Sequence, residues 1–93
     1  MTKTLLIAYD LNGGETSSEY QRLIKAIKDL GTWAKPLEST FLVVSSNTVS
    51  TIRDHLSKFI DSNDELLILD VSDDNWASKG INADVTKWMK NNV

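Results

Sequence analysis

The chain has 93 residues, 41% hydrophobic and 25% charged, which is ordinary for a single small globular domain covering residues 1–93. It contains no cysteine and one histidine, so a disulfide framework, a thiolate metal site and a two-histidine metal site within one chain are excluded. The net charge of −3 disfavours nonspecific binding of nucleic acid, which needs lysine and arginine to neutralise phosphates, although a local basic patch stays possible.

The first predicted element is a strand over residues 3–10, an apolar run that ends abruptly at Asp10. It opens into the turn Asn12-Gly13-Gly14. A helix follows, with Ser18 and Gln21 as a capping box at its start and Gly31 placed where a left-handed cap would end it. Its apolar residues recur at helical spacing and form one stripe: Tyr20, Leu23, Ile24, Ile27 and Leu30.

The second half of the chain alternates strands and helices again. A weak strand is predicted over residues 33–37, and Pro36 restricts it to a sheet edge or a bulge. Residues 40–45 form a clear strand, rich in β-branched and aromatic side chains. Asn47 and Thr48 can cap a second helix, whose apolar stripe is Val49, Ile52, Leu56, Phe59 and Ile60. A strand over residues 65–71 precedes a tail, residues 72–93, with a short helix predicted over residues 82–91 that presents Val85, Trp88 and Met89.

This β-α-β-β-α-β order with a helical tail predicts an α+β fold of the ferredoxin-like type. The expected sheet is antiparallel with strand order 4-1-3-2, and both main helices lie on one face. The end of the first strand should then lie beside Ser39 and Thr40 on one side and beside residues 63–65 on the other. Asp70 belongs at the opposite end of the sheet.

Three predicted strands are apolar on both of their alternating faces. Leu5, Ile7 and Tyr9 point one way, whereas Leu6 and Ala8 point the other. Two helices can cover only one face of the sheet, so either the tail or a second copy of the chain must cover the other.

Asp10 is the main candidate for chemistry, as a metal ligand or an acid–base group. The alternative is a solvated strand-end acid that accepts hydrogen bonds from the following turn, which is a common role. In a symmetric dimer, two copies of Asp10 near the two-fold axis could share a Mg²⁺ or Mn²⁺ ion. Asp64, with its neighbours Asp61 and Glu65, could add carboxylates on the same edge or could simply belong to a polar turn.

No apolar segment approaches the length of a membrane span. The apolar run after Lys3 meets Asp10 too soon to be a signal peptide. We therefore expect a cytoplasmic protein with no membrane contact.

Several short passages are similar to the small ferredoxin-like proteins around the second CRISPR adaptation protein, a superfamily that includes VapD-type toxins. The SinR-like branch is the part of this superfamily that the chain resembles. The passages that carry the resemblance are Ala8-Tyr9-Asp10-Leu11-Asn12, Gly31-Thr32-Trp33, Leu37-Glu38-Ser39-Thr40, Asp61-Ser62-Asn63-Asp64 and Trp76.

The resemblance implies a homodimer formed through sheet faces, with a paired Asp10 at the dimer axis. In some relatives that aspartate supports divalent-metal-dependent cleavage of RNA or DNA, and in the CRISPR adaptation complex the subunit is structural. This chain departs from the pattern because it is acidic and because its tail is predicted to be helical.

We therefore predict a small dimeric accessory or interaction module that is non-catalytic or degenerate. The alternative is a divalent-metal-dependent endonuclease, similar to an endoribonuclease, in which Asp10 from two chains holds Mg²⁺ and Asp64 is a secondary acid. A domain of the same fold that binds a small ligand is a third possibility.

Overall fold

A computed structural model describes residues 2–12 and 18–93 of the chain. The turn predicted at Gly13 and Gly14 lies outside these residues. Within the described ranges the elements are β1 (Lys3–Asp10), α1 (Ser18–Lys28), β2 (Trp33–Leu37), β3 (Thr40–Ser45), α2 (Val49–Leu56), the short 3-10 helix η1 (Ser57–Phe59), β4 (Glu65–Asp70) and α3 (Ala83–Asn92).

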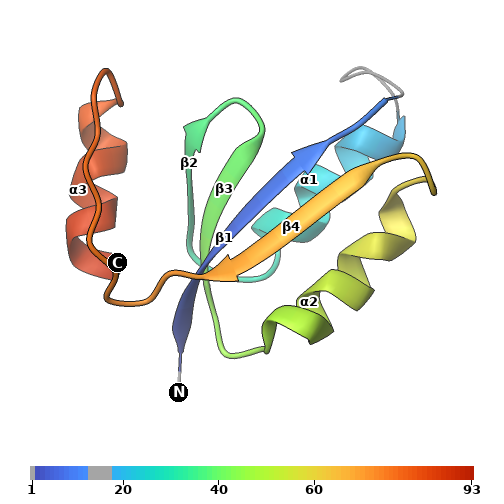
Figure 1. Cartoon of the computed structure of the whole chain (residues 1–93), viewed down its shortest axis with the longest axis horizontal. Coiled ribbons are helices and arrows are strands. Elements are labelled where there is room, and N and C mark those ends of the chain that lie inside the picture. Colours follow the sequence, from blue (N-terminus) through green and yellow to red (C-terminus); the bar gives the residue numbers. More distant parts are fainter. Residues whose placement is uncertain (1, 13–17) are drawn as a thin grey trace.

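The four strands form one sheet with the order β2-β3-β1-β4 (Figure 1). Read from the β4 edge, the same order is 4-1-3-2. Every neighbouring pair of strands is antiparallel. The predicted α+β class with an antiparallel sheet is therefore confirmed.

One face of the sheet packs against α1 and α2 and forms the core. On this face Leu5, Ile7 and Tyr9 of β1 meet Phe41 and Val43 of β3. The helices contribute the other buried residues of the cluster, which are Tyr20, Leu23, Ala26, Ile27, Ile52 and Leu56. The predicted apolar stripes of the two helices thus face the sheet, and Tyr9 is a core residue.

The tail covers part of the second face. Thr4 anchors it, because the Ser72 hydroxyl accepts a hydrogen bond from the Thr4 amide at 2.8 Å and the Thr4 hydroxyl donates to the carbonyl of Asn92. α3 lies against β2, at the edge of the sheet farthest from β4 (Figure 1). Leu42 and Ala34, on the second face of β3 and β2, are buried. The tail therefore covers part of the β2–β3 half of this face.

The β2 edge is shaped as its proline predicts. β2 is the outer strand next to β3, and its register shifts between Ala34 and Leu37. Lys35 and Pro36 lie inside the irregular stretch. Proline cannot donate a hydrogen bond to a neighbouring strand, so an edge with a bulge is the position it tolerates.

The helix boundaries differ slightly from the predictions. The hydroxyl of Thr48 accepts a hydrogen bond from the Thr51 amide, which confirms Thr48 as the cap of α2. The helix predicted to reach Ile60 instead tightens after Leu56 into η1. Asn82 caps α3, so the helix in the tail is confirmed.

The left-handed cap predicted at Gly31 is wrong. Among the described residues, the positive φ angles are at Asp73 and Gly80. A Cβ atom on Gly31 would instead collide with the main-chain oxygen of Val44. Glycine is required here because the chain after α1 passes directly against β3.

We expect Gly31→Ala to lower the free energy of unfolding by about 3 kcal/mol, near the upper end for overpacking, because the colliding atom belongs to a strand backbone. Gly80→Ala is the matched control: its φ is +76° and nothing lies near its missing Cβ. Only the left-handed strain of about 1 kcal/mol should appear there. Urea unfolding measures both, and equal losses would contradict the close approach to Val44.

Candidate functional site

Asp10 lies exposed at the end of β1, beside the neighbours that the topology predicts. The Tyr9 amide donates to the Ser39 carbonyl at 3.2 Å on one side, and Asp10 is opposite Glu65 of β4 on the other. Two acids thus meet directly across the strand pair at this edge. Like charges in such a position repel each other unless a cation or solvent screens them.

Asp64 joins the end of β1 to the turn between η1 and β4. One carboxylate oxygen accepts a hydrogen bond from the Asn12 amide at 2.9 Å, and the other accepts from the Asp61 amide at 2.8 Å. The Asn12 side chain also donates to the Asn63 carbonyl. Both Asp64 oxygens therefore already hold backbone in place, which is the structural role that the sequence left open for this residue.

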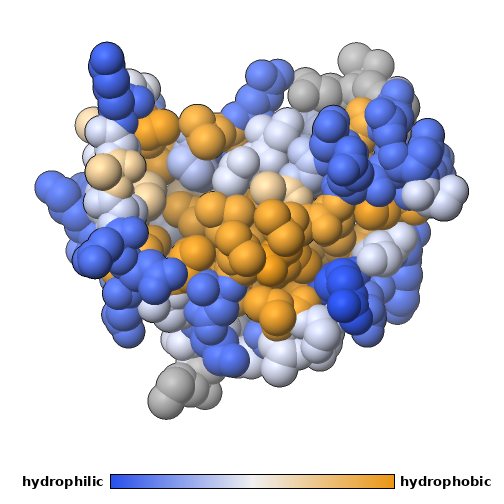
Figure 2. Space-filling model, in the orientation of Figure 1, coloured by the Kyte–Doolittle hydropathy of each residue, from blue (hydrophilic) through white to orange (hydrophobic). Residues whose placement is uncertain are grey.

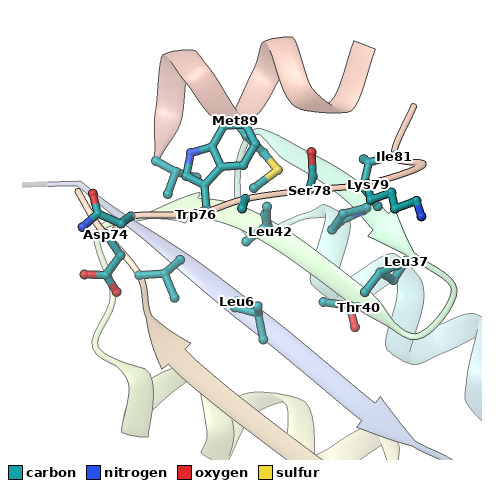
Figure 3. Close-up of a pocket in the computed structure, with 15 residues that line it drawn as sticks. Leu6, Leu37, Thr40, Leu42, Asp74, Trp76, Ser78, Lys79, Ile81 and Met89 are labelled. Carbon is teal, nitrogen blue, oxygen red and sulfur yellow. The ribbon is translucent and has the colours of Figure 1, made fainter. Parts of the chain in front are cut away.

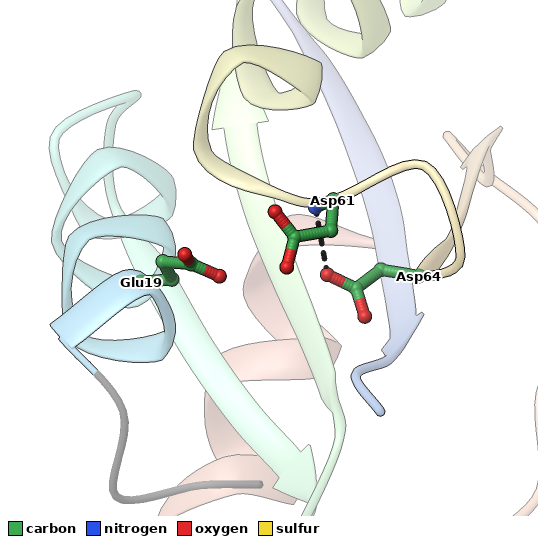
Figure 4. A group of neighbouring side chains, drawn as sticks. All are labelled: Glu19, Asp61 and Asp64. Atoms are coloured by element: carbon green, nitrogen blue, oxygen red, sulfur yellow. Dashed lines mark hydrogen bonds between the residues drawn. The ribbon is translucent and has the colours of Figure 1, made fainter. Parts of the chain in front are cut away.

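The carboxylates that come together are those of Glu19, Asp61 and Asp64, which we call the acidic cluster. One oxygen of each lies within 4.8 Å of the others (Figure 4). Asp10 is not a member of this cluster among the described residues. The sequence spacing groups Asp61 with Asp64 but does not indicate Glu19, which lies in the first turn of α1 and approaches them only because α1 begins beside this turn.

The charges of the acidic cluster act on the pKa of Glu19. The nearby carboxylate of Asp61 raises the pKa of Glu19 above its ordinary value of 4.5, and Asp64 adds to the effect. Three carboxylate oxygens at such distances are chemically suited to a hard cation such as Mg²⁺. Exposed acids often gather in this way without one, so the cluster by itself defines a repulsive corner.

The β1–β4 half of the second face stays open. Four apolar residues define this open half: Leu6 and Ala8 on β1, and Leu67 and Leu69 on β4. Leu67 is 56% exposed and Leu69 is 46% exposed. Figure 2 shows an apolar area across the middle of this side of the molecule. The predicted apolar second face is therefore present, and the tail covers only part of it.

A cavity of about 450 Å³ lies between the tail and the sheet. Its walls include Leu6 and Leu42 from the sheet and Trp76 and Met89 from the tail (Figure 3). Asp74 and Lys79 lie at opposite ends of it (Figure 3). Its size is within the range of small-molecule pockets, and its lining is suited to apolar groups. Leu6 belongs both to the wall of this cavity and to the open half.

The chain matches no model of a known protein family. No helix in residues 2–12 and 18–93 has the length and apolar character needed to cross a membrane. The interpretation of function therefore depends on the acidic cluster, the open half of the sheet and the tail.

Proposed function

We propose that this chain is a non-catalytic interaction module that works as a homodimer, with a second copy contacting the exposed leucines of β4. The observation that carries the proposal is the exposure of Leu67 and Leu69 on β4, a strand whose other apolar residues, Leu66 and Ile68, are only partly buried against the core. Large contiguous apolar patches mark interaction surfaces, because soluble monomers rarely expose them. The resemblance to the SinR-like branch also supports self-association.

The arrangement of the acids favours a non-catalytic module over the endonuclease alternative. Catalysis by that route needs Asp10 and a second ligand near it to hold Mg²⁺ or Mn²⁺. Asp64, the predicted second acid, instead directs its two oxygens to the amides of Asn12 and Asp61. The net charge of −3 also disfavours a nucleic-acid partner.

Sedimentation velocity at micromolar protein concentration tests the dimer. It compares two variants at leucines of similar exposure. Leu67→Lys on β4 and Leu37→Lys on β2 replace leucines that are 56% and 58% exposed. Burying a leucine is worth about 1.5–3 kcal/mol, and about half of Leu67 remains to be buried in each of two copies. Leu67→Lys should therefore weaken the dimer by about tenfold or more, whereas Leu37→Lys should leave it intact.

A wild-type chain that stays monomeric throughout, or equal weakening by both variants, would overturn this proposal. The non-catalytic part has its own measurement, in which the wild-type protein is incubated with RNA and DNA in the presence of Mg²⁺ or Mn²⁺. We expect no cleavage. Cleavage that disappears in Asp10→Ala would establish the endonuclease alternative.

A further inference from the structure

The two edges of the sheet differ in how they are protected. β2 carries a lysine, a proline and a register shift, and α3 packs against it. β4 has the sequence Glu65-Leu66-Leu67-Ile68-Leu69-Asp70, which contains no lysine or proline. Its register against β1 is unbroken. No described residue pairs with its outer side. Natural proteins usually protect such an edge, because it offers unpaired main-chain groups to another strand.

The residues with outward main-chain groups follow from the pairing with β1. The Val71 amide donates to the carbonyl of Thr4, which lies opposite it in the register. Hydrogen bonding alternates along an antiparallel pair, so the N–H and C=O groups of Leu69, Leu67 and Glu65 also point toward β1. The N–H and C=O groups of Leu66, Ile68 and Asp70 therefore point away from the sheet.

We propose that two copies of the chain join edge to edge, with β4 antiparallel to β4 of the second copy and Ile68 on the two-fold axis. This inference rests on the homodimer proposed above and specifies how it is built. Ile68 then lies opposite Ile68, and Leu66 lies opposite Asp70 of the second copy. In this register all the outward groups of Leu66, Ile68 and Asp70 pair with one another, which no other symmetric register achieves.

Charge favours the same register. The groove between β4 and α2 is lined by Val49 and Arg53 together with Leu66, Leu67 and Ile68. With Ile68 on the axis, Asp70 of the second copy arrives beside Leu66 and therefore near Arg53. Moving the axis to Leu67 would instead place Asp70 opposite Asp64 of the second copy, and like charges directly opposite are destabilising.

The apolar side chains of β4 also pair in this register. Leu67 lies opposite Leu69 of the second copy on the open face, where cross-strand apolar pairs stabilise a sheet. Val49 of α2, which is 38% exposed, lies beside the joint on the other face. The second copy thus contacts apolar residues on both faces of the strand.

This dimer separates the two copies of Asp10. Asp10 is opposite Glu65, three residues along the strand from Ile68 and one strand farther from the axis. Standard strand spacings then place the two Asp10 residues about 25 Å apart. One cation could not bridge them, so the edge-to-edge dimer and a shared-metal centre are mutually exclusive.

Disulfide cross-linking tests the register, because the chain has no cysteine of its own. Opposite residues in a hydrogen-bonded pair have Cα atoms about 5.5 Å apart, which a disulfide can span. Ile68→Cys should therefore cross-link to itself under mild oxidation, more than about tenfold faster than the exposed control Leu37→Cys. A mixture of Leu67→Cys and Leu69→Cys should also cross-link, because these residues lie opposite each other.

Leu67→Cys alone should cross-link poorly, since it is only diagonal to its own copy at about 7–8 Å. A dimer by sedimentation in which neither Ile68→Cys nor the mixture exceeds the Leu37→Cys rate would overturn this pairing and leave the homodimer standing. Rapid self-cross-linking of Leu67→Cys would have the same meaning. A chain that is monomeric at all concentrations would overturn both.

Discussion

Replacing Phe41 by alanine should lower the free energy of unfolding by about 3–5 kcal/mol, the range for truncating a buried aromatic residue. Phe41 is fully buried near the start of β3. Its ring stacks on Tyr9 at 6.3 Å and meets Trp33 edge to face at 5.7 Å. The strand therefore cannot collapse into the space left by the ring without moving two other aromatic residues. A domain of ordinary stability would lose a large part of its total.

Phe59→Ala is the matched control, because Phe59 is the other phenylalanine and lies in η1 at the border of the core. It is only partly buried and contacts His55 edge to face. We expect a loss of about 1–2 kcal/mol, since much of its surface is already in water. Urea unfolding of both variants provides the comparison. Equal losses would show that the core is not centred on β3.

Two aspartates of the acidic cluster should respond to substitution in opposite directions. Asp64→Ala removes the acceptor for the Asn12 and Asp61 amides and should destabilise the protein by about 1–2 kcal/mol, as the loss of a helix cap does. Asp61→Asn keeps the shape of the side chain and removes the charge that opposes Glu19. It should raise the thermal unfolding midpoint at pH 7.

The Asp61→Asn gain should depend on pH in a defined direction. The pKa of Glu19 is higher in the folded protein than its ordinary value of 4.5, so folding is opposed by its charge at neutral pH. As the pH falls through that raised pKa, the folded protein takes up the proton and the repulsion is relieved. The difference between wild type and Asp61→Asn should therefore shrink toward pH 4.

Adding Mg²⁺ separates this interpretation from a metal site. If a cation occupied the acidic cluster, wild type would gain stability from millimolar Mg²⁺ and Asp61→Asn would lose that gain. We expect neither protein to respond beyond ionic screening. A Mg²⁺-dependent rise in the wild-type midpoint alone would contradict the view of the cluster as a repulsive corner.

Local patterns were sufficient to predict the strands and helices of this chain. The run that ends at Asp10, the proline in β2 and the apolar stripe of α1 each correspond to an element in the structure. These patterns depend on neighbours within a few residues, which a sequence displays directly. The alternation of Leu5 with Leu6 likewise predicted two apolar faces, and both are present.

The prediction failed where distant segments meet. Gly31 is not a helix cap. Glycine is needed there because the Val44 backbone lies against it, and Val44 is distant in the sequence. The approach of Glu19 to Asp61 and Asp64 is likewise not predictable from local patterns, since these residues are far apart in the sequence. Asp64 is a candidate metal ligand in the sequence, but in the structure one of its carboxylate oxygens accepts a hydrogen bond from the Asn12 amide. Sequence spacing carries no information on such encounters.

The closed β2 edge limits how far the chain can polymerise. A sheet with two bare edges could add copies at both ends and grow into a fibril. Here the bulge at Pro36 and the neighbouring α3 block one end, so an assembly built through β4 stops after a single addition. The helical tail that shields the sheet would then also act as the terminator that keeps the particle finite.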